Sequence, residues 1–248
     1  MGLEATFGKC DFIMFMDADD LLMPNAVESL TREINRTSAD VIVSNFYTEK
    51  KGVGLEVYKS DGNATWLHGK IYRVSYLQQN GINFLTSIRV NEDSNFNMKA
   101  LLTTTKCGHI EEITYLWRDV NTSITRRDTL TFFVNGVNDF IYGQLEALRF
   151  IKSKLGSVDP ELLGKVFGFV YNWYQISKEK DGAPDDELVK EFLAFEDLQY
   201  HLQNKKFVQV VLNDKVRGNF VGYGFCVFFH ESVDFWYTRL TGKMLVGE

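Results

Sequence analysis

An apolar run that ends in carboxylates is the feature that most constrains the fold of this chain. Residues 11–20 read Asp-Phe-Ile-Met-Phe-Met-Asp-Ala-Asp-Asp. The stretch 12–16 has the length and composition of a buried strand, and Pro24 shortly afterwards suits the first turn of a helix. Ligands of α/β proteins bind outside the carboxyl ends of their strands. The carboxylates there form a candidate site for a hard divalent cation and the phosphates it carries: Asp17, Asp19 and Asp20.

The same carboxylates have a simpler explanation, because a helix N-terminus favours negative charge without any bound ion. A bare Asp-x-Asp is also common in proteins. Its position between an apolar strand and a helix that begins with proline favours the cation site. The apolar run 40–46 reads as the next strand, so the pattern strand–helix–strand predicts a parallel pair with a right-handed crossover in an α/β fold.

The remaining pattern divides the chain into two parts. Residues 49–65 are rich in glycine, lysine and polar groups and predict an exposed loop or hairpin. Residues 66–77 predict an ordered turn that becomes a short helix, 92–102 a helix and 110–117 a strand. After about Arg127 the pattern is helical, over 132–154, 161–178 and 185–202, and short strands are expected at 208–212 and 220–229. We expect the boundary near residue 128.

Composition excludes several classes of protein. The 248 residues are 45% hydrophobic and 24% charged, as in ordinary globular proteins. The net charge of −6 and the lack of a long basic run argue against duplex nucleic acid as a partner. No apolar stretch approaches the roughly 20 residues of a transmembrane helix. The 3 cysteines are far apart and form no CxxC pair, which argues against a zinc ribbon or a disulfide framework and favours a reducing compartment.

Three further segments carry candidate site residues. Glu92 and Asp93 open a helix, where they are either N-terminal caps or a general base with its neighbour. The run 66–73, Trp-Leu-His-Gly-Lys-Ile-Tyr-Arg, suits recognition of a phosphate or a sugar, although His68 alone is more often structural. The polar loop 118–127 is either a basic connector or a flexible loop that closes over a diphosphate, with Arg126 or Arg127 as the clamp.

Taken in order, these segments resemble the family-2 glycosyltransferases of GT-A fold. The family pattern Gly-Leu-x-x-Ala-x-Gly-x-Tyr-Ile-x-Phe-Leu-Asp-Ala-Asp-Asp has its counterpart in residues 2–20, with slightly altered spacing around Gly8. The other family motifs follow in family order: Trp66-x-x-Gly69-Lys70-x-Tyr72-Arg73, then Glu92-Asp93, then Tyr115-x-Trp117-Arg118 and Ser123-Ile124-Thr125-Arg126. The resemblance covers residues 2–127.

The resemblance implies a fold and a set of roles. The fold is α/β: a partial GT-A, Rossmann-like mixed sheet over 1–128, followed by a mainly helical region over 129–248 with short terminal strands. The donor is a nucleotide-diphosphate sugar, transferred with inversion to a hydroxyl of a saccharide or another acceptor, with Mn²⁺ or Mg²⁺. The implied residues are Asp17, Asp19 and Asp20 for metal and nucleotide sugar, Asp93 as the base with Glu92 beside it, and Lys70, Arg126 and Arg127 for the leaving diphosphate.

The sequence also departs from the family pattern at its start. The early family stretches Pro-x-Tyr-Asn and Asp-Asp-Gly-Ser, which bind the nucleotide, have no counterpart, and Met1 falls inside a family segment. We therefore expect a truncated or split transferase, completed by a partner chain or by a homo-oligomer. The alternative is a degenerate, inactive module of the same fold that binds or has a structural role. We expect a cytoplasmic protein. The alternative is a peripheral protein at the inner face of the membrane.

Overall fold

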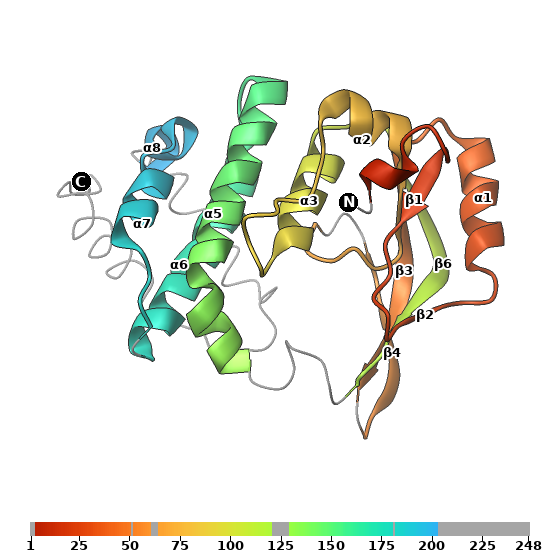
Figure 1. Ribbon diagram of the computed structural model, residues 1–248, viewed down its shortest axis with the longest axis horizontal. Coiled ribbons are helices and arrows are strands. Elements are labelled where there is room, and N and C mark those ends of the chain that lie inside the picture. Colours follow the sequence, from red (N-terminus) through yellow and green to blue (C-terminus); the bar gives the residue numbers. More distant parts are fainter. Residues whose placement is uncertain (1–2, 51, 61–63, 121–128, 181, 203–248) are drawn as a thin grey trace. The chain divides into compact units, whose positions relative to one another are not determined.

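The structure, a computed structural model, describes residues 3–50, 52–60, 64–120, 129–180 and 182–202 (Figure 1). The chain divides into two compact units, Met1–Thr129 and Leu130–Glu248. The first unit holds a mixed sheet with helices, and the described part of the second is helical. The α/β class predicted from the sequence is thereby confirmed.

The sheet of the first unit has six strands. Five of them lie in the order β1-β5-β3-β6-β2, and β4 pairs with β3 beyond this path. Only β3 and β6 run parallel, while every other pair is antiparallel. The strands are β1 (Phe12–Met14), β2 (Leu21–Leu22), β3 (Val41–Lys50), β4 (Gly54–Tyr58), β5 (Lys70–Arg73) and β6 (Cys107–Trp117).

Helices lie on both faces of this sheet (Figure 1). Helix α1 (Ala26–Arg36) covers one face, where Leu30 packs on Ile42 of β3 and Ile110 of β6. Helices α2 (Val74–Asn80) and α3 (Glu92–Leu102) lie on the other face (Figure 1). A short 3₁₀ helix, η1 (Glu4–Thr6), precedes the sheet.

One expectation about the sheet is wrong. The sequence predicts that strands 11–16 and 40–46 pair directly, but β5 lies between β1 and β3 and pairs antiparallel with both. The two expected strands are still parallel to each other across β5. The segment 70–73 was assigned to a turn, because a lysine at its first position hides the strand alternation. The hairpin expected within 49–65 is present as β3 and β4.

Helix α3 is more deeply buried than its sequence predicts. Helical spacing predicts that Asn95 and Lys99 face solvent while Phe96 faces inward, yet Asn95 and Lys99 are both buried, Asn95 completely. All residues from Ser94 to Leu101 are buried, so the helix has no solvent-facing stripe beyond its first turn. The reverse occurs on α1. Helical spacing places Val27 on one face with Leu30, yet Val27 is 70% exposed while Leu30 is buried.

The second unit contributes four helices among its described residues: α5 (Thr129–Leu155), α6 (Pro160–Glu179), α7 (Asp186–Leu193) and α8 (Glu196–Leu202). The side chains of Asp159 and Asp185 cap α6 and α7 by accepting bonds from backbone N–H groups of the first turn. The single helix expected over 185–202 is broken at Ala194. None of the described helices combines the length and hydropathy needed to cross a bilayer. The short strands expected at 208–212 and 220–229 lie outside the described residues.

Candidate active site

The loop that joins β1 to β2 carries the predicted carboxylates. Asp17 and Asp19 are exposed, whereas Asp20 is only 4% exposed. The N–H of Asp20 donates to the carbonyl of Asp17 at 3.2 Å, so the loop makes a tight turn. Leu21 and Leu22 then pair with β6. The three carboxylates are therefore presented between two strands of one sheet.

Asp20 is held by two hydrogen bonds from β6 and the segment after it. The Tyr115 hydroxyl donates to Oδ2 of Asp20 at 2.5 Å, and the backbone N–H of Arg118 donates to Oδ1 at 2.8 Å. The N–H of Asp17 donates in turn to the Tyr115 hydroxyl at 3.3 Å. The Arg118 guanidinium donates to the carbonyl of Asp19 at 3.3 Å. These bonds fix the loop against the end of β6.

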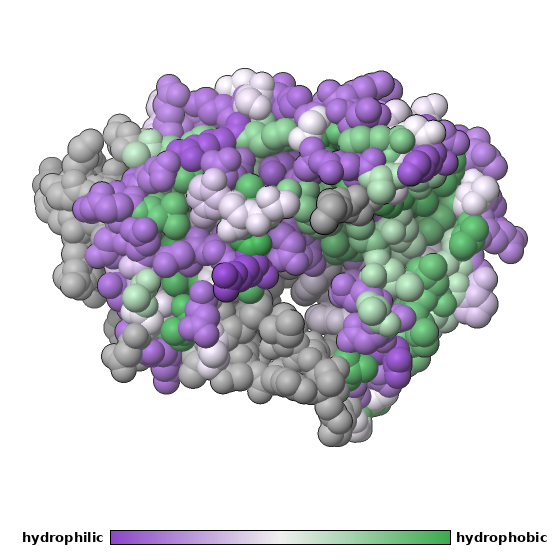
Figure 2. All heavy atoms as spheres, viewed as in Figure 1, coloured by the Kyte–Doolittle hydropathy of each residue, from purple (hydrophilic) through white to green (hydrophobic). Residues whose placement is uncertain are grey.

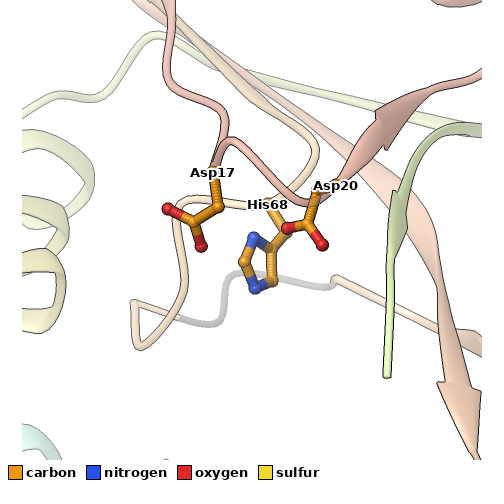
Figure 3. A group of neighbouring side chains, drawn as sticks. All are labelled: Asp17, Asp20 and His68. Atoms are coloured by element: carbon orange, nitrogen blue, oxygen red, sulfur yellow. The ribbon is translucent and has the colours of Figure 1, made fainter. Parts of the chain in front are cut away.

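His68 completes a group that fits a metal ion. Its imidazole is 5% exposed and stacks on the Tyr115 ring, with centroids 4.8 Å apart. One ligand atom each from Asp17, Asp20 and His68 lie within 4.8 Å of one another (Figure 3). Figure 3 shows the imidazole between the two carboxylates. The sequence predicts Asp17, Asp19 and Asp20 for the metal, and Asp19 is not part of this group.

The charges of the loop affect each other. Burial, and then the neighbouring carboxylates of Asp20 and Asp19, raise the pKa of Asp17 above its usual value. Burial and the bond to Asp20 likewise raise the pKa of the Tyr115 hydroxyl, which therefore stays a donor at neutral pH. Repulsion among carboxylates of this kind is relieved by a divalent cation. Two carboxylates and an imidazole are a donor set that fits such an ion.

The first turn of α3 carries the second pair of predicted residues. Asn91 precedes the helix in the left-handed conformation, with φ of 62°, and Glu92 and Asp93 follow, both partly buried. Burial, then the charge of Glu92, raise the pKa of Asp93 to about 6. This value suits a base that exchanges protons near neutral pH.

The helix and the loop lie close together. The Asp17 charge contributes to the raised pKa of Asp93, so the two carboxylates are within electrostatic reach. The ring of Phe15, two residues before Asp17, meets the ring of Phe96, three residues after Asp93, at 5.4 Å between centroids. The structure therefore brings the predicted base to the same side of the sheet as the predicted metal group.

Buried polar side chains of β5 connect to the helix that carries Asp93. Lys70 and Tyr72 alternate with Ile71 and Arg73 on β5 and are completely buried. The Tyr72 hydroxyl donates to Oδ1 of Asn97 at 2.5 Å, and Asn97 stands one helical turn after Asp93. The Nζ of Lys70 donates a hydrogen bond to the carbonyl of Trp66. Burial lowers the pKa of Lys70 to about 8, and the charge of Asp93 acts against this shift.

The structure places the other predicted residues less centrally. Lys70, predicted to contact a leaving diphosphate, is completely buried, and its Nζ donates to the carbonyl of Trp66. Arg126 and Arg127 lie outside the described residues. Sequence reasoning named His68 only as part of a polar run and Tyr115 only as part of a motif. The alternation His68, Lys70, Tyr72 at the start of β5 is the signal that indicates inward-facing positions.

Comparison with known proteins identifies the first part of the chain. The family model described as "Glycosyl transferase family 2" matches residues 1–102, which include the carboxylate loop, His68 and the start of α3. This region is therefore similar to glycosyl transferase family 2. No curated protein matches the chain.

Solved structures share their fold with a larger part of the chain. The S. aureus TarS 1–349 crystal structure in complex with UDP has a TM-score of 0.58 and 15% identity, over 92% of this chain and 74% of that one. The complex of TarS 1–349 with UDP-GlcNAc has a TM-score of 0.50 and 16% identity over 84% of this chain. The chain spans 59% of that second structure. At these identities the likeness shows a shared fold.

Proposed function

We propose that the site transfers a sugar from a nucleoside-diphosphate sugar to an acceptor hydroxyl, with inversion and with a divalent cation. The family 2 match of residues 1–102 supports the reaction class. The single observation that carries the mechanism is the contact of the Phe15 and Phe96 rings, 5.4 Å between centroids, because it brings the start of α3, with Asp93, beside the carboxylate loop. A base and a cation group are both needed for a direct displacement at the anomeric carbon.

Asp93 acts as the general base of this displacement. Its carboxylate takes the proton of the acceptor hydroxyl while the acceptor oxygen forms the new bond to the anomeric carbon. The bond from that carbon to the diphosphate oxygen breaks in the same step, and its electron pair leaves with the nucleoside diphosphate. Glu92 supports the role, because its charge raises the pKa of Asp93 toward the working pH.

Asp17, Asp20 and His68 would hold the cation, with Asp19 beside them. When bound, a divalent cation neutralises negative charge on the leaving diphosphate. Mn²⁺ is the first ion to test, because Mg²⁺ prefers an all-oxygen shell and this group includes an imidazole. Arg126 and Arg127 remain predictions for the same leaving group.

The donor to test first is a uridine-diphosphate sugar. The structures that share this fold contain UDP-GlcNAc and UDP, by their own descriptions. We propose the same donor class here, with a saccharide or another hydroxyl compound as the acceptor. The cytoplasmic location stays a prediction from the cysteine content.

The decisive experiment measures release of UDP from UDP-GlcNAc by the full chain with Mn²⁺. Asp93→Asn is expected to lower the rate by about 10²- to 10⁴-fold, the usual contribution of a general base. Glu112→Gln serves as the control, since Glu112 makes only a surface ion pair with Arg32 and should leave the rate unchanged. Equal rates for the wild type and Asp93→Asn contradict the assignment of the base.

A second reading, an inactive module or one half of an enzyme, has a specific observation behind it. Strand β1 pairs with β5 on one edge, and no strand pairs with its other edge among the described residues. Apolar residues gather on part of the surface of the first unit (Figure 2), and Met16, two residues after β1, is exposed. We propose that a strand from a partner chain or a second copy covers this edge.

Two measurements test the partner proposal. Light scattering is expected to show a dimer or a complex, and hydrogen exchange is expected to show that its formation protects the amides of Phe12 to Met14. A monomer that transfers sugar at full rate with these amides unprotected contradicts the proposal.

A further inference from the structure

Tyr115 contacts every member of the candidate cation group. Its hydroxyl donates to Oδ2 of Asp20 at 2.5 Å and accepts from the N–H of Asp17 at 3.3 Å. The face of its ring stacks on His68, with centroids 4.8 Å apart and planes inclined by 22°. One side chain therefore fixes a carboxylate, the backbone of a second carboxylate residue and the imidazole.

The position of Tyr115 is itself fixed by the sheet. It lies on β6, where its Cα pairs with Leu22 of β2 on one side and with Phe46 of β3 on the other. Its side chain is completely buried. The loop 17–20 and the segment before β5, in contrast, are irregular and have few backbone bonds of their own. The tyrosine is thus the rigid element against which the ligand-bearing segments are held.

We propose that Tyr115 is the positioning residue of the cation site, which it assembles from Asp17, Asp20 and His68. The proposal rests on the proposed function, because it takes this group as the place where the cation binds. Asp20 can still bind a metal ion while it accepts from Tyr115, since a carboxylate has four lone-pair sites. Bonds from outer groups of this kind orient metal ligands, and their loss weakens metal affinity about 10- to 100-fold.

Tyr115→Phe is the direct test, since it removes the hydroxyl and keeps the ring that supports His68. Mn²⁺ affinity is measured by electron paramagnetic resonance of the free ion, a readout that needs no catalytic turnover. The expected result is a dissociation constant raised about 10- to 100-fold relative to the wild-type chain.

Tyr76→Phe is the matched control. Tyr76 is also buried in the first unit, and its hydroxyl bonds to the carbonyl of Ala100 and to Thr103, away from the carboxylate loop. Its loss should cost a similar amount of stability and leave Mn²⁺ affinity within twofold. If both variants lose affinity equally, the effect is general and the positioning role of Tyr115 is refuted.

The outcomes separate the two proposals. A wild-type chain that binds no Mn²⁺ overturns the cation site and this inference together. A wild-type chain that binds Mn²⁺, with Tyr115→Phe unchanged, overturns the positioning role alone. If Tyr115→Phe fails to fold, the wild type is labelled at ¹³Cζ of tyrosine and titrated with Zn²⁺, a diamagnetic ion that accepts imidazole and carboxylate ligands. The Tyr115 signal should move while the Tyr76 signal stays, and a Tyr115 signal that does not move overturns the role.

Discussion

At the scale of single residues, Asp93 links the electrostatics of the site to its chemistry. Burial and the charge of Glu92 raise its pKa from an ordinary 3.8 to about 6, and Asp17 adds to the effect. A carboxyl group with such a pKa is protonated in mild acid and ionised at neutral pH. Only the ionised form can accept the proton of the acceptor hydroxyl.

The pH dependence of transfer follows from this pKa. We expect kcat/KM to rise with pH through about 6 and to level off above it, because the base must lose its proton first. Measuring kcat/KM between pH 5 and 8 with saturating Mn²⁺ tests this rise, the acid limb of the rate profile. A profile that is flat across this range contradicts Asp93 as the titrating base.

Lys70 provides a second residue-scale prediction. The charge of its buried ammonium lowers the pKa of Asp93 and so favours the ionised carboxylate, against the effects of burial, Glu92 and Asp17. Lys70→Met should therefore raise the pKa of Asp93 and move the acid limb of the rate profile to higher pH.

Lys50→Met is the control, because Lys50 makes only a surface pair with Glu56. If Lys70 has a purely structural role, or contacts the diphosphate directly, Lys70→Met should lower the rate equally at every pH. The pH at which the rate rises would then stay unchanged. An unmoved limb therefore contradicts the electrostatic role.

At the scale of elements, β5 depends on the glycine that precedes it. Gly69 has a φ of +67°, and a Cβ there would stand 2.7 Å from the carbonyl oxygen of Ser44 on β3. The N–H of Ser44 donates to the carbonyl of Gly69 at 2.8 Å, so the two segments cannot separate without losing this bond. This close approach sets the position of His68, the next residue back along the chain.

Gly69→Ala and Gly81→Ala form a matched pair. Gly81 has nearly the same φ, +68°, with nothing within 4 Å of its would-be Cβ. Gly81→Ala should cost about 1 kcal/mol of unfolding free energy, the penalty for a left-handed alanine. Gly69→Ala should cost clearly more, since the backbone of Ser44 must also shift. Urea unfolding of both variants checks this, and equal losses contradict the importance of the contact.

The elements show why sequence reasoning found some features and missed others. The strand 12–14 and helix 92–102 were predictable, since an apolar run and a helix with acidic residues in its first turn are strong local signals. Strand β5 was not, because a buried lysine at its first position breaks the apolar pattern. The burial of Asn95 and Lys99 also depends on packing against the sheet, which helical spacing alone does not reveal.

At the scale of the whole molecule, the site is assembled from segments far apart in sequence. Asp17 and Asp20 come from one loop, His68 from the segment before β5, Tyr115 from β6 and Asp93 from α3. The carboxylates were predictable because each follows or opens a regular element. The roles of His68 and Tyr115 were not, because they arise only when the order of the strands brings β5 and β6 beside the loop.

The central claim is that this assembled site performs cation-dependent sugar transfer with Asp93 as the base. The most direct measurement is the rate of UDP release from UDP-GlcNAc in the presence of an acceptor mixture, with Mn²⁺ or with a chelator, for the wild-type chain and Asp93→Asn. We expect UDP release that needs both Mn²⁺ and Asp93. Release that persists in the chelator, or is equal in Asp93→Asn, would contradict the claim.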